Sequence, residues 1–479
     1  MAWLVARTDI PLRRLWAVLA VVPLAMPSFV AALALAGSTG ASGLLSRALG
    51  VVGLGPISRM EGYWGALLAV TMATYPYVYL LTLAALKRMD PAPEEAARSL
   101  GRGPIRAFTA ASLPQLRRAL AGGALLAALY ALSDFGAVSL MRYTTLTRAI
   151  FQRFDSGLDR APTAVLGILL VALTVVLLII ETRARGHRRL RSGPGARREP
   201  ARIALGRARP WATAWAALVC SSFVILPVLV MFDWIRRGAD YGRLRGIPWE
   251  AMSTSLWLAL VAALVTTALA MPVSLLANRH PRPWTRALER TGYGANALPG
   301  VVIGLALVFL GARYLPGLYQ TFTMLLAAYV IRFFAEALAG VDTALNAVNP
   351  RAEEAARSLG RRPWRAFAEV SLPAMRPGLV AAVMLVFLSV IKELPATVLL
   401  LPTGARTLAT EVWTQTSVGA YGAASVAALV LMVICAPFIV VAVHEHVDDG
   451  HAQGPRRRTV RRAVTSTGDE PGGTASRSG

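Results

Sequence analysis

Apolar residues are gathered in long blocks along the chain, and most of the arginines lie between the blocks. The blocks are about 18–25 residues long, which is the length a helix needs to cross roughly 30 Å of hydrocarbon. This pattern predicts an all-α, polytopic membrane protein. The ten predicted spans lie near residues 15–36, 64–86, 119–141, 161–181, 212–232, 252–277, 295–312, 322–345, 378–399 and 421–443.

The distribution of arginine predicts which loops face the cytoplasm. Residues 182–210 hold ten arginines, and cytoplasmic loops carry the excess of positive charge in membrane proteins. Counting spans outward from this linker places residues 87–118 and 346–377 on the same side. The segment 448–479 is rich in Gly, Arg, Ser and Thr, a composition that predicts a disordered tail.

Composition supports the membrane class and excludes other functions. The chain is 55% hydrophobic and has a mean hydropathy of +0.52. A net charge of +24 could suggest nucleic-acid binding. We expect no nucleic-acid partner, because the basic residues follow the loops and form no single basic face. The two cysteines, Cys220 and Cys435, lie inside apolar blocks, so we expect no disulfide, metal site or cofactor.

One segment of the sequence occurs twice. Residues 94–114 (EEAARSLGRGPIRAFTAASLP) and 353–373 (EEAARSLGRRPWRAFAEVSLP) are identical at 16 of 21 positions, at an offset of 259. Six predicted spans separate the copies, so both copies face the same compartment and the repeat is parallel. The predicted organisation is a first repeat (1–181), a linker (182–210), a second repeat (211–447) and the tail.

The similarity continues upstream of the two copies at an offset of 272. The matched residues are Arg7 with Arg279, Pro11 with Pro283, Arg14 with Arg286 and Pro27 with Pro299. Spans 212–232 and 252–277 then have no counterpart in the first half. We therefore expect the first repeat to be N-terminally truncated or given a mis-set start, relative to a twelve-span protein. A genuine four-plus-six arrangement is the alternative.

The chemistry of each copy predicts a helix–turn–helix. Asp90-Pro91 and Asn349-Pro350 are typical of a helix N-terminus. Glycine follows each short helix where a positive φ is needed, and Leu-Pro is expected to close a second short helix. The recurring positions are Glu95, Ala96, Ala97, Gly101, Ala111, Leu113 and Pro114 in the first copy, and Glu354, Ala355, Ala356, Gly360, Val370, Leu372 and Pro373 in the second.

These positions resemble the EAA motif of ATP-binding cassette (ABC) importer permeases. The resemblance implies that both loops are coupling helices that dock on nucleotide-binding subunits, with two ATPase copies for two loops. ATP-driven closure of the ATPases would then draw the loops together and turn the pore outward. The chain holds no Gly-x-x-x-x-Gly-Lys-Ser/Thr phosphate-binding loop, so ATP hydrolysis is expected in a separate subunit, and the chain itself is not expected to be an enzyme.

Two acidic residues fall inside predicted spans at equivalent positions. The offset of 259 maps Asp134 onto Glu393, and charge within a membrane is usually functional. These carboxylates could line the path of a cation. Alternatively, each lies at the water interface, or Glu393 pairs with Lys392.

The sequences around these two acids are Leu-Ser-Asp-Phe-Gly-Ala-Val and Lys-Glu-Leu-Pro-Ala-Thr. They resemble the corresponding segments of two-repeat ferric-iron permeases, whose relatives include thiamine permeases. The resemblance implies a bacterial plasma-membrane permease that receives substrate from an extracytoplasmic binding protein, with ferric iron as the expected substrate. Thiamine, another small solute and a non-functional truncated permease are alternatives. An ion-driven secondary transporter would instead show inverted repeats, and a membrane enzyme would need clustered acidic or histidine residues.

Overall fold

The computed structural model describes residues 1–53, 55–157, 160–185, 203–242, 246–295 and 298–448. Within these ranges the chain is helical without a β-strand, apart from an isolated bridge between Thr8 and Ile203. The predicted all-α membrane class is therefore confirmed. Most of the linker (186–202) and nearly all of the predicted tail (449–479) lie outside the described residues.

Each half consists of membrane helices joined by short helices. The first half contains α1 (Ala2–Arg7), α2 (Arg13–Leu19), η1 (Val22–Ala25), α3 (Ser28–Ser38), α4 (Leu44–Val51), α5 (Gly62–Arg88), α6 (Ala92–Ser99), α7 (Pro104–Ala107), η2 (Phe108–Ser112), α8 (Leu113–Ser133), α9 (Gly136–Leu140), α10 (Leu146–Asp155) and α11 (Arg160–Arg185). The second half contains η3 (Gly206–Ala208), α12 (Arg209–Cys220), η4 (Ser221–Ile225), α13 (Leu226–Asp240), α14 (Trp249–Arg279), α15 (Pro283–Gly294), α16 (Gly300–Tyr314), α17 (Phe322–Asn346), α18 (Pro350–Ser358), α19 (Pro363–Ala366), η6 (Phe367–Ser371), α20 (Leu372–Ile391), α21 (Pro395–Leu400), α22 (Leu408–Ser417) and α23 (Tyr421–Asp448).

Among the described residues, eight helices are long and apolar enough to cross a membrane, and a ninth crossing is possible in two pieces. Two of the ten predicted spans are not single full-length helices, and these two spans occupy equivalent positions in the two halves. Predicted span 15–36 is broken, since its two parts meet at an angle of 100°. Predicted span 295–312 is only the 15-residue helix α16, about 22 Å long at 1.5 Å per residue. Pro27 and Pro299 precede α3 and α16, and proline removes a helical hydrogen bond and clashes with the preceding turn.

Two further predicted spans end early. We expected helices to residues 141 and 399, but α8 ends at Ser133 and α20 ends at Ile391. In both halves the membrane helix ends just before the acidic residue, and the chain then continues as a short helix, α9 or α21. Asp134 and Glu393 thus lie at helix breaks.

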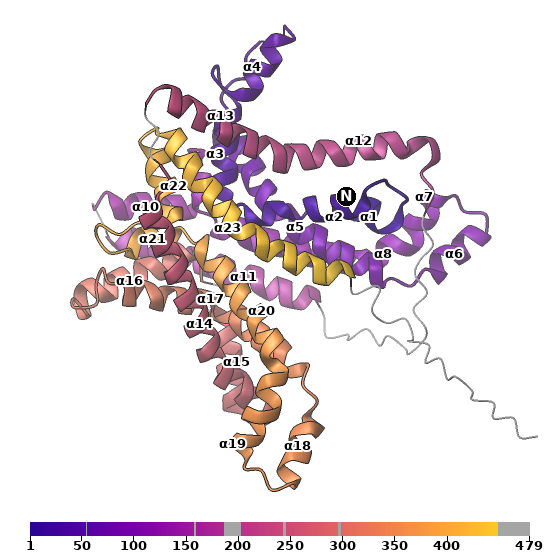
Figure 1. Cartoon of the computed structure of the whole chain (residues 1–479), viewed down its shortest axis with the longest axis vertical. Helices are drawn as coiled ribbons and strands as arrows, with labels where there is room; N and C mark the ends of the chain where they lie inside the picture. Colours follow the sequence, from indigo (N-terminus) through magenta and orange to yellow (C-terminus); the bar gives the residue numbers. More distant parts are fainter. Residues whose placement is uncertain (54, 158–159, 186–202, 243–245, 296–297, 449–479) are drawn as a thin grey trace, which may run out of the picture.

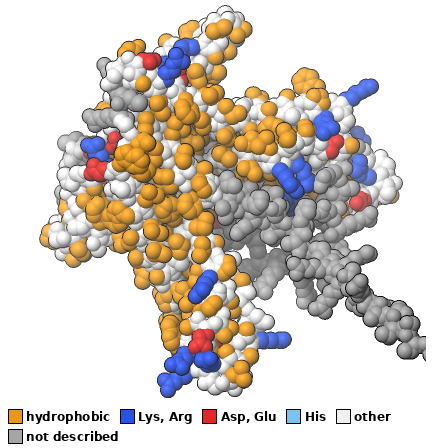
Figure 2. Space-filling model, viewed as in Figure 1, with side chains coloured by type: hydrophobic (Ala, Val, Ile, Leu, Met, Phe, Trp, Pro, Cys, Tyr) orange, Lys and Arg blue, Asp and Glu red, His pale blue; other side chains and the backbone are white. Residues whose placement is uncertain are grey.

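The helices form two arms that meet at one end. In Figure 1, α5 and α8 run along one arm, whereas α14, α17 and α20 run along the other. The arms converge around α3, α21 and α22, and they diverge towards α6 and α7 on one arm and α18 and α19 on the other. Helix α9 packs against α3 at this junction. Apolar side chains cover the face of the arms seen in Figure 2, and charged side chains gather towards the ends of the molecule.

Small residues allow close packing within each arm. A Cβ added at Gly340 or Gly378 would lie 2.5 Å from the Cβ of Ala382 or Ala344, so α17 and α20 are nearly in backbone contact. Interfaces of small residues are typical of helix association in membranes, where the hydrophobic effect gives little drive.

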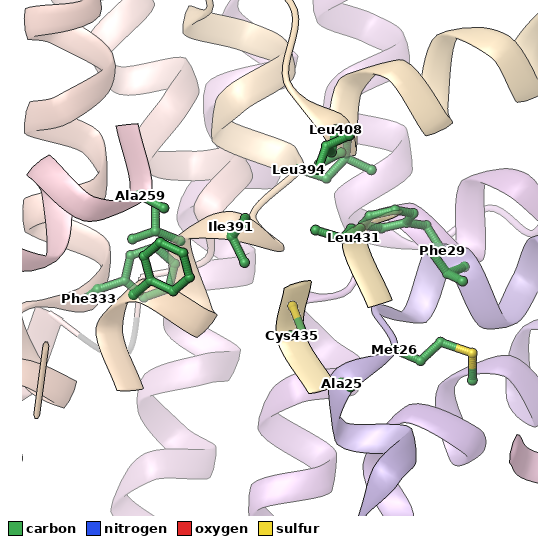
Figure 3. Close-up of a cluster of buried hydrophobic side chains, with 14 of the residues drawn as sticks. Ala25, Met26, Phe29, Ala259, Phe333, Ile391, Leu394, Leu408, Leu431 and Cys435 are labelled. Carbon is green, nitrogen blue, oxygen red and sulfur yellow. The ribbon is translucent and has the colours of Figure 1, made fainter. Parts of the chain in front are cut away.

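The two halves also interlock across the junction. Helix α13 of the second half packs against α3 of the first half and against α23. Phe29, Leu394 and Leu431, from both halves, belong to one buried cluster (Figure 3). A Cβ added at Gly136 would lie 2.8 Å from the Phe29 side chain and 3.2 Å from that of Leu394. This central seam thus joins α9 and α3 of the first half to the residue that precedes α21 in the second half.

Candidate coupling loops and central cavity

The repeated loops, defined as residues 90–114 and 349–373, begin as their sequences predict. The backbone N–H of Ala92 donates to Asp90 Oδ1 (3.0 Å), and that of Arg351 donates to Asn349 Oδ1 (3.1 Å). Each side chain therefore satisfies an N–H group left free at the start of the short helix.

Glycine ends the short helix in both loops. Gly101 and Gly360 have φ values of 81° and 87°. The next N–H, of Arg102 or Arg361, donates back to the carbonyl of Ala97 or Ala356 at 3.2 Å. This is the Schellman arrangement, in which a residue with positive φ satisfies the free carbonyls of a helix end. The expected turn is confirmed at both positions.

The Leu-Pro pair has a different role from the one expected. Leu113-Pro114 and Leu372-Pro373 do not close a second short helix, because they open the membrane helices α8 and α20. A single π-helical turn, η2 or η6, joins each helix to the short helix before it. Proline lacks an N–H donor, and a proline at the start of a helix loses no internal hydrogen bond.

An ion pair connects each repeated loop to a helix outside the loop, α1 in the first half and α14 in the second. In the first half, Arg7 Nη2 lies 2.7 Å from Glu94 Oε2, and the Ser112 hydroxyl donates to the same oxygen at 2.5 Å. The second half repeats this clasp with Arg279, Glu353 and Ser371. The clasp therefore joins the two ends of each repeated loop to an arginine that is distant in sequence.

Sequence reasoning chose the neighbouring glutamates. Glu95 and Glu354 are exposed, and it is Glu94 and Glu353 that make the clasp. A signal was available, because Arg, Glu and Ser are identical at all three positions under the two repeat offsets.

The outer surface of each loop carries an exposed leucine that the sequence analysis did not select. Leu100 is 82% exposed and Leu359 is 85% exposed, directly before the glycines that end α6 and α18. Each repeated loop therefore exposes the same apolar side chain at the equivalent position. Ala96 and Ala355 are exposed on the same short helices, and Ala97 and Ala356 are half-buried.

A cavity of about 290 Å³ lies between the arms and receives side chains from both halves. Its lining includes Asp134 and Glu393, which are 7% and 8% exposed. Asp134 Oδ2 accepts from the N–H groups of Ala137 and Val138, at 3.1 and 3.3 Å. The carboxylate therefore caps the N-terminus of α9.

Glu393 has the equivalent position at α21. Its two oxygens accept from the N–H groups of Ala396 and Thr397, both at 3.0 Å, and the Thr397 hydroxyl donates at 2.6 Å. Negative charge is favoured at a helix N-terminus, where free N–H groups point outward. The structure thus brings both predicted acidic residues to one cavity, each as the cap of a short helix.

The residue that faces each cap differs in size. Ser28 begins α3 and its hydroxyl donates to Asp134 Oδ1. The equivalent Gly300 begins α16, and a Cβ there would lie 2.7 Å from Glu393 Oε1. The longer acid in the second half is therefore matched by the loss of a side chain opposite it.

The fold and the site define an all-α membrane transporter with two parallel halves. The family described as "Binding-protein-dependent transport system inner membrane component" matches residues 1–185 and 270–451, and the chain belongs to this family. It is therefore a multi-pass permease of a bacterial ABC importer. Permeases of this kind work with an ATPase and a binding protein.

Several curated proteins are similar to the chain. The Fe(3+)-transport system permease protein FbpB 2 of Haemophilus influenzae is 34% identical over 384 residues, which are 78% of this chain and 75% of that protein. The ferric transport system permease protein FbpB of Actinobacillus pleuropneumoniae is 21% identical over 87% of this chain and 64% of its own length. The putative 2-aminoethylphosphonate transport system permease protein PhnV of Salmonella paratyphi A is 27% identical over 40% of this chain and 72% of its own length.

Proposed function

We propose that this permease forms the membrane pathway for ferric iron delivered by an extracytoplasmic binding protein. The observation that carries the proposal is the 34% identity to a ferric-iron permease across 78% of the chain, which includes both halves. The similarity to the phosphonate permease covers only 40% of the chain. It gives less support to a phosphonate substrate.

The repeated loops are the proposed docking sites for two ATPase subunits. Three observations support this role: the loops lie at the tips of diverging arms, they are nearly identical, and both present an exposed leucine. The residues proposed to form the docking elements are those of the EAA pattern together with Leu100 and Leu359. The clasps would transmit a movement of each loop to its arm, because Arg7 and Arg279 belong to α1 and α14, outside the loops.

The central cavity is the proposed pathway. Asp134 and Glu393 line it from opposite halves, and closing the arms would change its shape. Their hydrogen bonds to helix termini support a structural part in this path: the carboxylates hold α9 and α21 against the central seam.

The proposal is tested with the permease, its ATPase and its binding protein purified together and reconstituted in lipid vesicles. We expect ATP-dependent uptake of radioactive iron from the loaded binding protein, and no uptake of labelled thiamine or 2-aminoethylphosphonate. The ferric assignment would be overturned if a binding protein loaded with thiamine or phosphonate stimulates ATP hydrolysis and that solute, but no iron, enters the vesicles. A complex that assembles but moves no solute would favour the non-functional alternative.

A further inference from the structure

The two halves line the central cavity with different chemistry at equivalent positions. The first half supplies small or phenolic side chains, and the second half supplies three charged ones and a serine. The equivalent pairs are Ala73 and Arg332, Tyr77 and Glu336, Tyr130 and Ser389, and Ser133 and Lys392. All the members of these pairs line the cavity. Its second-half face is therefore a charged surface without a counterpart across the pseudo-twofold axis.

The carboxylates of the cavity already have hydrogen-bond donors. Asp134 and Glu393 each accept three hydrogen bonds, from two backbone N–H groups and a hydroxyl. Glu336 Oε2 accepts from the hydroxyl of Ser389 at 2.7 Å. Two of the three acids are thus committed to helix termini, and these two are poorly disposed to coordinate a passing metal ion.

The cationic groups, in contrast, keep free donors. Lys392 Nζ donates to the Leu24 carbonyl of the first half at 3.1 Å, which leaves two of its three N–H groups. Arg332 makes no hydrogen bond and no ion pair within 4 Å to any part of the chain that the structure describes. Its guanidinium carbon lies 5.8 Å from the centroid of the Phe333 ring, and it attracts the carboxylates of Glu336 and Glu393 without contacting them. A guanidinium carries five N–H donors, arranged to bind carboxylate or phosphate oxygens in pairs.

The lining holds three carboxylates and two cations. Asp134, Glu336 and Glu393 already accept hydrogen bonds within the protein, whereas Arg332 and Lys392 keep free donors. A ferric ion coordinated by an oxyanion would bring oxygen atoms that accept hydrogen bonds from these free N–H groups. Charge-assisted hydrogen bonds of this kind are the strong ones.

On the basis of the proposed ferric function, we propose that iron crosses this permease as a complex with an oxyanion, and that Arg332 and Lys392 bind the anion. The phenol rings of Tyr77 and Tyr130, whose centroids are 6.2 Å apart and whose planes are tilted by 42°, face the complex from the first half. The anion is therefore held on one side only, which fixes the orientation of the complex in the cavity.

The test uses the reconstituted complex of permease, ATPase and binding protein. Iron is supplied on the binding protein with labelled inorganic phosphate, carbonate or citrate in separate experiments, and iron and anion are counted in the same vesicles. We expect iron and one of these anions to enter in a constant molar ratio. Iron uptake without any of the three anions overturns the proposal.

Variants distinguish recognition of the anion from a structural role. Arg332→Ala gives the second half the residue that the first half carries at Ala73, and we expect iron uptake to fall at least about tenfold, the effect of 1.4 kcal/mol. Arg332→Lys, which keeps the charge, should recover most of the uptake, whereas Arg332→Gln, which keeps the shape, should not. Equal uptake by the Gln and Lys variants contradicts anion binding.

Two controls separate this inference from the proposed function. Arg313→Ala changes an exposed arginine at the end of α16, outside the cavity lining, and should leave uptake unchanged. ATP hydrolysis stimulated by the binding protein reports whether each Arg332 variant still assembles. If the unmodified complex hydrolyses ATP but transports no iron with any of the three anions, the proposal of ferric transport itself fails. If it transports iron and Arg332→Ala does so equally well, only the anion proposal fails.

Discussion

Arg7 and Glu94 form an ion pair in which each side chain is 4% exposed, whereas the equivalent pair of Arg279 and Glu353 is 36% and 12% exposed. The same three residue types therefore make a buried clasp in the first half and a more solvent-accessible one in the second. The last part of the linker explains part of the difference. The N–H of Ile203 donates to the Arg7 carbonyl at 2.8 Å, so this segment crosses the first clasp.

The first prediction concerns the stability of the two clasps. Arg7→Met should lower the free energy of unfolding by about 3–5 kcal/mol, because it leaves the Glu94 carboxylate buried without its charge partner. Arg279→Met should cost less, about 1 kcal/mol or below, as is typical of pairs that water reaches. Thermal unfolding in detergent measures both. Adding Glu94→Gln to Arg7→Met should recover much of the loss, and equal losses in the two single variants would contradict the burial argument.

The second prediction concerns the turns of the repeated loops. Gly101→Val with Gly360→Val should reduce the coupling of ATP hydrolysis to transport while the membrane helices remain folded. No heavy atom lies within 4 Å of an added Cβ at either glycine, so the cost arises from positive φ, about 1–2 kcal/mol or more per site. The readout is solute moved per ATP hydrolysed.

The matched control for these turns is Gly103→Val. Gly103 lies in the same loop, has open space at its Cβ, and has no positive φ. It should therefore keep normal coupling. Normal transport by the double glycine variant would remove the support for docking through these turns.

The third prediction concerns the exposed leucines. Leu100→Asp with Leu359→Asp should weaken ATPase binding by at least about tenfold, since a charged carboxylate replaces an apolar contact and must lose water on docking. Val52→Asp is the control, because Val52 is 75% exposed at the end of α4, in the connection that precedes α5, whereas the first repeated loop follows the other end of α5. Affinity for the ATPase, measured with both proteins in detergent, distinguishes the variants. The docking assignment fails if both bind equally.

The fourth prediction exchanges the two caps. Gly300→Ser alone should destabilise the second half by about 1–3 kcal/mol, the usual cost of overpacking, because the new Cβ would approach Glu393 Oε1 to 2.7 Å. Adding Glu393→Asp recreates the first-half pair of Ser28 and Asp134, and most of the stability should return. Unfolding midpoints of the single and double variants test this compensation. No recovery in the double variant would show that side-chain length is not what matches the two positions.

The comparison of spans shows how hydropathy can mislead. The predicted spans 15–36 and 295–312 are apolar over nearly their full length, yet Pro27 and Pro299 divide or shorten them. An average over a window gives proline little weight, although a single proline removes a backbone hydrogen bond. The same limitation placed Asp134 and Glu393 inside long helices, when each ends one helix and caps the next.

The sequence by itself determined the membrane class, the parallel repeat, and the first short helix and glycine turn of each repeated loop. Apolar block length, capping residues and a glycine at positive φ act over a few neighbouring residues, so their effects can be read from the chain. Only the tertiary structure decided which glutamate is paired, because Glu94 meets Arg7 across 87 positions of sequence. It also decided that Arg332 and Asp134 line one cavity. Such contacts depend on how whole helices pack, and no local pattern encodes that packing.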